Sequence, residues 1–130
     1  MSEYLFAYGT LRLNQNHPMA GSLAENATLI GLAVLPKARL YRIDWYPALI
    51  ETSDVNDEVI GDVFILNDVS ILKKIDEYEG IGVGEEPYEY RRVKARIKTE
   101  KEELDSWVYF YNIPLPEKAE LIESGDFLNP

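Results

Sequence analysis

Cysteine is absent from this 130-residue chain, and histidine occurs once, at His17. The absence of cysteine excludes disulfide bonds, thiolate catalysis and cysteine-ligated zinc. A single histidine has no second imidazole with which to share a metal ion, so we expect no metal site and no cofactor. No segment approaches the roughly 20 apolar residues of a membrane span, and the N-terminus lacks the features of a signal peptide. We therefore expect a soluble, cytoplasmic protein without a membrane partner.

Basic residues are scarce. The chain has 13 lysines and arginines against 23 acidic residues, which gives a net charge of −10. Such a surface repels a phosphate backbone on average, so we expect no nucleic-acid partner. A small-molecule ligand is compatible with this charge.

Hydrophobic residues make up 46% of the chain and aromatic residues 12%, which suits one globular domain over residues 1–130. Alternating and β-branched stretches predict several strands, which we place at Tyr4–Tyr8, Ala27–Ile43 with an interruption at Pro36, Tyr46–Ile50, Val59–Leu66, Tyr88–Ile97 and Leu104–Tyr111. Helical patterns predict a short helix opened by Pro18 and a stronger one over Asp68–Glu79, with Asp68 as N-cap and Gly80 at the position after the C-cap. The tail from Pro114 to Pro130 is expected to be mostly irregular. These elements indicate an α+β fold in which the strands curl into a small mixed β-barrel.

The end of the first strand is the first candidate binding site. Gly9 follows the alternating run Tyr4–Tyr8 and has no Cβ, so it permits either a positive φ or the close approach of another group. The hydroxyl of Thr10 and the N–H groups of Gly9, Thr10 and Leu11 are placed to form a concavity that accepts an anion. An ordinary strand end with a glycine turn is the alternative interpretation.

Glu79 is the second candidate. It lies seven residues after Leu72 and four after Ile75, which places it on the apolar face of the predicted helix. Burial and the negative end of the helix dipole both raise the pKa of a carboxyl group in this position. Such a group can act as a general base or acid near neutral pH. Asp76 and Glu77, by contrast, are interpreted as exposed acids.

Two other interpretations of Glu79 remain open at this point. Its side chain either swings out to water from a frayed last turn, or it pairs with Arg91 or Arg92. Tyr90 and Arg92 share one face of the following strand, so both are possible supporting residues near Glu79; an exposed strand arginine is the alternative for Arg92. Tyr109 and Tyr111 are expected to be exposed, which leaves room for a dimer.

Several motifs together resemble the gamma-glutamylcyclotransferase-like family, of the gamma-glutamylamine cyclotransferase type. In chain order they are Tyr8-Gly9-Thr10-Leu11-Arg12, Tyr46-Pro47-Ala48-Leu49, Val59-Ile60-Gly61-Asp62-Val63-Phe64, Ile75-Asp76-Glu77-Tyr78-Glu79-Gly80, Tyr90-Arg91-Arg92-Val93, Trp107-Val108-Tyr109 and Ser124-Gly125-Asp126. They run over almost the whole chain. This sequence departs from the family pattern only mildly, at Ile75 and Phe127.

The resemblance implies a small mixed β-barrel flanked by one or two short helices. It also implies that Tyr8, Gly9, Thr10 and Leu11 bind a glutamyl group and that Glu79 accepts the proton. The implied reaction closes a γ-glutamyl amide or peptide into 5-oxoproline and releases an amine or amino acid, without a metal. A binding module that holds a glutamyl-like metabolite without turning it over is the main alternative. A phosphate or nucleotide binder is disfavoured, because no Walker-type lysine follows Gly9.

Overall fold

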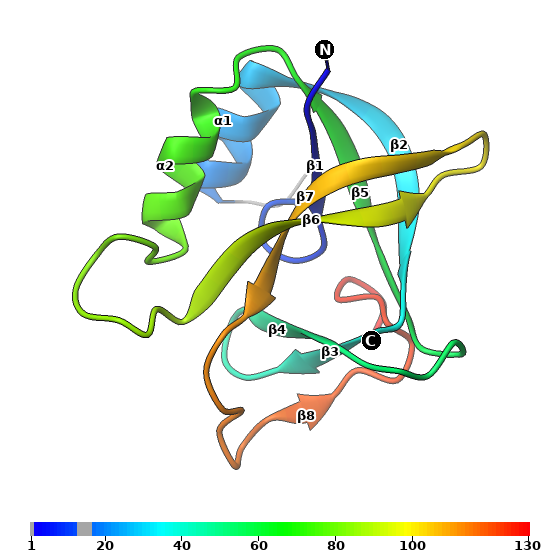
Figure 1. Cartoon of the computed structure of the whole chain (residues 1–130), viewed down its shortest axis with the longest axis vertical. Helices are drawn as coiled ribbons and strands as arrows, with labels where there is room; N and C mark the ends of the chain where they lie inside the picture. The colour runs from blue at the N-terminus through cyan, green and yellow to red at the C-terminus, as the bar shows by residue number, and fades with distance from the viewer. Residues whose placement is uncertain (1, 13–16) are drawn as a thin grey trace.

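The computed structural model describes residues 2–12 and 17–130. Its strands are β1 (Tyr4–Ala7), β2 (Ala27–Pro36), β3 (Ala38–Arg42), β4 (Pro47–Glu51), β5 (Glu58–Leu66), β6 (Tyr90–Lys98), β7 (Glu103–Tyr111) and β8 (Glu120–Leu121). Its helices are α1 (Pro18–Asn26) and α2 (Ile71–Tyr78). The α+β fold predicted from the sequence is confirmed, with both helices packed against the outside of the barrel (Figure 1).

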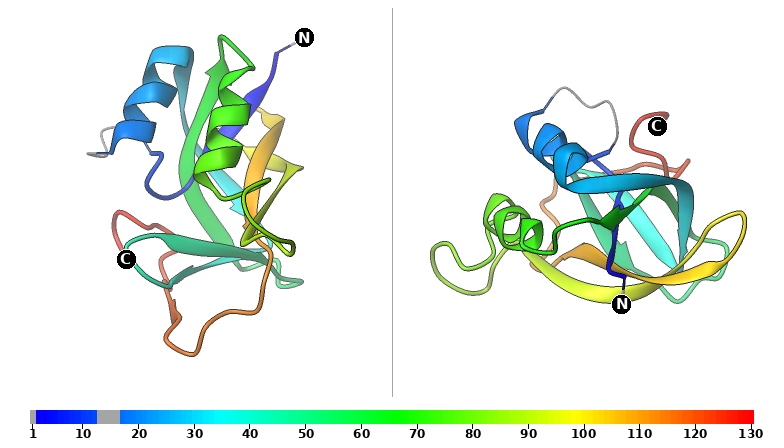
Figure 2. Two further views of the ribbon diagram at one scale, coloured as in Figure 1. Left: turned by 90° about the vertical axis from the view of Figure 1, so that its left-hand side faces the viewer. Right: turned by 90° about the horizontal axis from the view of Figure 1, so that it is seen from above.

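Five strands form a closed barrel in the order β1-β5-β2-β6-β7. All neighbours are antiparallel except β1 and β7, which run parallel, so the barrel is mixed. The antiparallel sheet β4-β3-β8 lies across one end of the barrel, and α1 and α2 lie side by side near the other (Figures 1 and 2). The site described below lies where the end of β1, the end of α2 and the start of β4 meet.

Successive side chains of β1 point to opposite faces of the strand, and both faces are buried. Leu5 and Ala7 pack in an apolar cluster that also receives the inner faces of α1 and α2. Phe6 and Tyr8 pack in a second cluster, which fills the barrel toward the β4-β3-β8 sheet. The first strand is therefore held on both sides, and the loop that follows it starts from a fixed point.

Three expectations from the sequence need adjustment. Helix α2 begins at Ile71 rather than Asp68, because the Asp68 carboxylate accepts the N–H of Ser70 at 3.0 Å and closes a turn before the helix. The tail contains one short strand, β8, that the sequence did not suggest. Tyr109 and Tyr111 are buried, so the expectation that they are exposed was wrong.

Two other boundaries agree with the prediction. The β-prone stretch from Ala27 is divided after Pro36, where Lys37 has a φ of 57° between β2 and β3. The charged segment at residues 99–102 joins β6 to β7 as a hairpin tip. None of the helices in the described part of the chain is long and apolar enough to cross a membrane.

Candidate active site

A cavity of about 280 Å³ opens between the end of β1, the end of α2 and the segment before β4. Seven of its lining residues are aromatic and two carry carboxylates. The lining residues are Phe6, Ala7, Tyr8, Gly9, Thr10, Leu11, Trp45, Tyr46, Pro47, Tyr78, Glu79, Gly80, Glu89, Tyr90 and Tyr109. The structure thus brings the predicted loop, Glu79 and Tyr90 to one cavity, whereas Arg92 is not part of its lining.

The loop after β1 is held closely from both sides. A Cβ atom on Gly9 would lie 2.7 and 2.8 Å from Cγ and Cδ of Pro47, which is closer than packed carbon atoms approach. The φ of Gly9 is not positive, so the close approach is the reason for glycine here. The hydroxyl of Tyr8 donates to the carbonyl of Tyr109 on β7, and the N–H of Arg12 donates to the carbonyl of Gly9 at 3.1 Å. The loop is a rigid turn.

The rigid turn leaves backbone donors available. Among the residues that the structure describes, none accepts a hydrogen bond from the N–H groups of Gly9, Thr10 or Leu11. Gly9 and Leu11 are nevertheless buried. Buried N–H groups are almost always paired with something, and successive free N–H groups favour an anion. The loop therefore has the donors that a carboxylate or an oxyanion requires.

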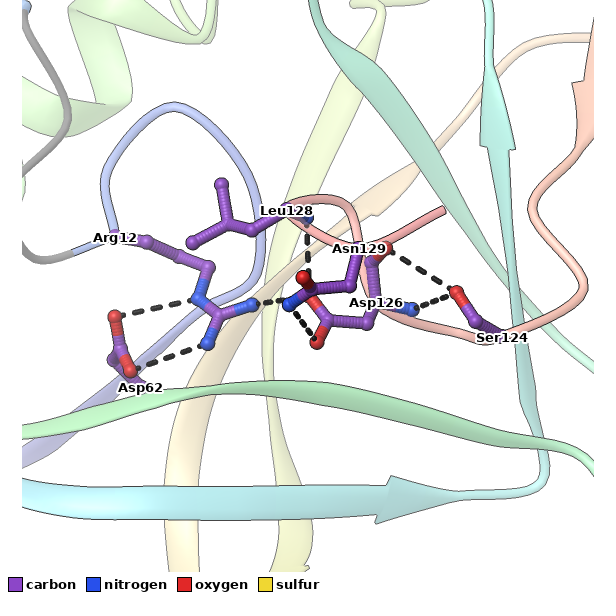
Figure 3. Close-up of polar contacts among 6 residues, drawn as sticks. All are labelled: Arg12, Asp62, Ser124, Asp126, Leu128 and Asn129. Atoms are coloured by element: carbon purple, nitrogen blue, oxygen red, sulfur yellow. Dashed lines mark hydrogen bonds and ion pairs between the residues drawn. The ribbon is translucent and has the colours of Figure 1, made fainter.

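A buried ion network fixes the end of this loop. The Arg12 side chain donates to both oxygens of Asp62, at 3.3 and 3.4 Å, and to Oδ1 of Asp126 at 2.7 Å (Figure 3). Arg12 is only 4% exposed. Burial disfavours the Asp126 anion, yet hydrogen bonds from Asn129 and the Leu128 N–H, with the Arg12 charge, hold the pKa of Asp126 below its ordinary value. The network ties the loop to β5 and to the C-terminal tail.

The end of α2 fixes the position of Glu79. Glu79 is the C-cap, and Gly80 follows with a φ of 82°. The N–H of Gly80 donates to the carbonyl of Glu77 at 3.0 Å, and the N–H of Ile81 donates to that of Asp76 at 2.8 Å. These two bonds form a Schellman motif, which satisfies the last carbonyls of the helix. The last turn is therefore closed rather than frayed.

The surroundings of the Glu79 carboxyl group disfavour its charge. Burial, followed by the negative charges of Glu89 and Asp76, raises the pKa of Glu79 to about 8. Within residues 2–12 and 17–130, no side chain or N–H group donates a hydrogen bond to this carboxylate, and no cation pairs with it. Arg92 pairs with Asp76 and Arg91 with Glu51, so neither takes the role of partner to Glu79.

Asp76 is not the exposed acid that the sequence suggested. Its carboxylate accepts two hydrogen bonds from Arg92, at 2.7 and 3.0 Å, and one from the hydroxyl of Tyr109 at 2.6 Å. The Arg92 guanidinium also lies over the ring of Trp107, 4.4 Å from its centroid. Arg92 thus acts at a distance from the cavity, by holding α2 against β6 and β7 one turn before Glu79.

Glu89 was missed by the sequence analysis. It lines the cavity opposite the loop, and its Oε2 accepts a hydrogen bond from the Tyr46 hydroxyl at 2.8 Å. Tyr90, its neighbour, donates to the carbonyl of Pro47 at 2.6 Å. In the sequence Glu89 follows two other acidic residues of an apparent loop, so no local pattern distinguishes it. The two contacts hold the start of β4 and the residue before it against the start of β6.

Comparisons with known proteins agree with this fold. A family model described as gamma-glutamyl cyclotransferase, AIG2-like, matches residues 5–129. A protein of Methanocaldococcus jannaschii, provisionally named a gamma-glutamylcyclotransferase, is 32% identical over 128 residues, which cover 96% of this chain and 95% of that protein.

Solved structures show the same fold. The protein ytfP of Escherichia coli is 29% identical and superposes with a TM-score of 0.69, over 97% of this chain and 96% of that one. An AIG2-like protein of Mus musculus is 20% identical with a TM-score of 0.70, over 89% and 81% of the two chains. The second likeness concerns the fold alone.

Proposed function

The chain belongs to the gamma-glutamyl cyclotransferase, AIG2-like family, and we propose that it converts a γ-glutamyl amide or peptide into 5-oxoproline and a free amine or amino acid. One observation carries the proposal above all. A carboxyl group with a pKa of about 8, Glu79, shares a cavity with a loop whose backbone N–H groups have no acceptor among the described residues. The first feature suits a group that moves protons, and the second suits a site for a substrate carboxylate.

The proposed reaction needs only proton transfer and positioning. The α-amine of the substrate attacks the γ-carbonyl carbon, the new C–N bond closes a five-membered ring, and the bond to the leaving nitrogen breaks. Ionised Glu79 takes a proton from the attacking amine, and protonated Glu79 then gives it to the leaving nitrogen. Because one carboxyl group does both steps, atoms and charge balance without a further reactant.

We assign the substrate α-carboxylate to the loop of Tyr8, Gly9, Thr10 and Leu11. The described lining of the cavity contains Glu79 and Glu89 but neither lysine nor arginine. The donors available to an anion there are therefore N–H and hydroxyl groups, and the loop has three N–H groups without an acceptor among the described residues. Holding the glutamyl group by this end fixes its amine near its own carbonyl, which is a proximity effect.

A binding module without turnover makes a different demand on the site. It requires Glu79 to be ionised and ion-paired, so that it serves as a fixed contact. The described cations lie elsewhere, and the pKa of Glu79 is raised rather than lowered. This favours the enzyme over the binding module. A cytoplasmic location and independence from metals stay predictions from the sequence.

The test is a panel of γ-glutamyl amino acids, γ-glutamyl-lysine, glutathione and γ-glutamyl alkylamines, incubated with the protein and analysed for 5-oxoproline by mass spectrometry. Formation of 5-oxoproline that depends on Glu79 supports the proposal. Tight binding of a panel member without formation of any product would contradict the proposed enzyme and support the binding module instead.

A further inference from the structure

The only histidine of the chain is at the start of a line of polar contacts that ends in the cavity. His17 Nε2 lies 3.2 Å from the Tyr78 hydroxyl, and that hydroxyl lies 2.9 Å from Oγ1 of Thr10. Thr10 and Tyr78 line the cavity, whereas His17 does not. No part of the proposed reaction has used these contacts so far.

The contacts at the two ring nitrogens of His17 fix the position of its proton. His17 is the N-cap of α1, and its Nδ1 accepts the backbone N–H of Met19 at 3.1 Å. An acceptor nitrogen carries no hydrogen, so the neutral ring carries its hydrogen on Nε2. Nε2 therefore donates to the oxygen of Tyr78.

The direction of the remaining hydrogens follows from this first one. The Tyr78 hydroxyl has two described polar contacts, Nε2 of His17 and Oγ1 of Thr10, and either oxygen can donate in the second. With His17 as the donor to Tyr78, the arrangement that gives the Tyr78 hydrogen an acceptor directs it to Oγ1 of Thr10. Burial raises the pKa of Tyr78 above its ordinary value, so the phenol keeps this hydrogen at neutral pH. The Thr10 oxygen then accepts, and the hydrogen of its own hydroxyl is left to donate. Thr10 lines the cavity.

Aromatic packing holds the histidine ring in the plane that these contacts need. The ring stacks on Trp45, with centroids 5.9 Å apart and planes 14° apart, and it meets the edge of Tyr78 at 5.0 Å. Trp45 itself lines the cavity. A rotation of the imidazole about its bonds is therefore opposed by both contacts.

We propose that His17 and Tyr78 are positioning residues, which orient the hydroxyl hydrogen of Thr10 into the cavity as a donor to the substrate α-carboxylate. The inference rests on the proposed function in that the ligand is a glutamyl group. It adds a side-chain donor to the N–H groups of the loop, and the direction of that donor is set by Tyr78, 68 residues away in the sequence.

The variants that test this separate orientation from structure. His17→Asn keeps a good helix N-cap but lacks an atom at the position of Nε2. Tyr78→Phe keeps the ring and removes the hydroxyl. Thr10→Ser keeps the donor, and Thr10→Val removes it. We expect unchanged melting temperatures, a KM raised about three- to tenfold by His17→Asn and about tenfold or more by Thr10→Val, and a smaller rise in KM for Thr10→Ser than for Thr10→Val.

The double variants make the test sharp. If the three residues form one line, His17→Asn adds nothing to Tyr78→Phe or to Thr10→Val, because the line is already broken. Effects on KM that multiply in these pairs would overturn the proposal, and so would a His17→Asn protein within twofold of the unchanged one. If the panel of γ-glutamyl compounds is bound but not turned over, the proposed function fails. The same comparison of single and double variants, measured as dissociation constants, still decides the inference. Absence of both binding and turnover overturns both.

A measurement without any ligand completes the test. Because His17 is the only histidine, the imidazole nitrogen signals in a ¹⁵N NMR spectrum belong to it without further assignment. We expect the neutral form protonated at Nε2, and a shift of that signal in Tyr78→Phe. A ring protonated at Nδ1 would reverse the direction of every hydrogen in the line and overturn the proposal.

Discussion

Arg92 binds Asp76 through two hydrogen bonds, of 2.7 and 3.0 Å, and not Glu79, which lies three residues further along the same helix end. Arg92 is thus committed to Asp76, which does not line the cavity. Among the described residues, Glu79 shares the cavity with Glu89 and has no ion pair. Burial, followed by the negative charges of Glu89 and Asp76, raises its pKa.

Glu79→Gln is expected to abolish most of the turnover. The amide keeps the size of the side chain and removes the group that titrates, so a loss of about 10²- to 10⁴-fold in rate is expected, or roughly 3–5 kcal/mol of barrier. Affinity for the substrate should change much less, because binding is assigned to the loop. Glu77→Gln is the matched control, since Glu77 is exposed on the same turn. Turnover like that of the unchanged protein in a folded Glu79→Gln would end the mechanism.

The pH dependence of kcat/KM should rise toward alkaline pH. The base form of Glu79 is needed, and its pKa is about 8, so the rate should increase as pH rises to about 8 and then level. The measurement is a kcat/KM profile from pH 5.5 to 9.5 on one γ-glutamyl compound. A profile that is flat between pH 5.5 and 7.5 would contradict the assignment.

The same carboxyl group should make stability depend on pH. Its folded pKa lies above its unfolded value of about 4.5, so the folded state holds the proton more tightly and stability falls as pH rises from about 4.5 to about 8. The free energy of unfolding of Glu79→Gln should not fall in this pH range. The variant should therefore be more stable than the unchanged protein at pH 9, by on the order of 2–4 kcal/mol, and about as stable at pH 4.5. Urea unfolding at both pH values measures the difference. Equal stabilities at pH 9 would show that the carboxylate is well solvated.

Gly9→Ala should displace the binding loop. The new Cβ would lie 2.7 Å from the Pro47 ring, so either the loop or the segment before β4 must move. We expect a loss of about 1–3 kcal/mol in unfolding free energy and weaker binding of a γ-glutamyl compound in calorimetric titration. Gly21→Ala is the control: no atom lies within 4 Å of its Cβ, and it should stabilise α1 by about 0.5–1 kcal/mol. Unchanged affinity in Gly9→Ala would remove the loop from the site.

Arg12→Ala should be strongly destabilising. It takes the guanidinium from two carboxylates, Asp62 and Asp126, in a place where Arg12 is 4% exposed. Breaking a buried ion pair from one side typically costs about 3–5 kcal/mol. Arg96→Ala removes an exposed pair with Asp105 and should cost less than about 1 kcal/mol. Urea unfolding compares the two, and similar small losses would mean that the Arg12 network adds little.

Arg92→Ala should act on the pH profile from outside the cavity. Without Arg92 the Asp76 carboxylate keeps only the Tyr109 hydroxyl as a partner among the described residues, and its negative charge weighs more on Glu79. The alkaline rise of kcat/KM should therefore move upward by roughly 0.5–1 pH unit. Arg91→Ala removes only an exposed pair with Glu51 and should leave the profile in place. If Arg92→Ala leaves the pH profile of kcat/KM in place, Arg92 has only a structural role.

The sequence predicted best what depends on near neighbours in the chain. The period of two in β1 and the period of the helix before Gly80 placed Tyr8 and Glu79 correctly with respect to the apolar clusters. The start of α2 was wrong by three residues, because Asp68 closes a turn with Ser70 instead of capping the helix. The helix periodicity predicted that Asp76 is exposed to solvent. A periodicity carries no information about the strand that supplies Arg92.

Contacts between distant residues account for what was missed. The parallel pairing of β1 with β7 and the contact of Tyr46 with Glu89 join segments that share no local pattern. The line from His17 to Thr10 depends on one ring being turned toward another 61 residues away. The catalytic role of Glu79 and the binding role of the loop stay proposals for the experiments above.

The bond between Arg12 and Asp126 spans 114 residues of the chain. A nascent polypeptide emerging from the ribosome has made β1 and its loop long before it has made this aspartate. Every strand of the barrel precedes Asp126 in synthesis, so the barrel can close while the loop still lacks its last anchor. The loop therefore acquires this anchor only after all five strands of the barrel have been synthesised.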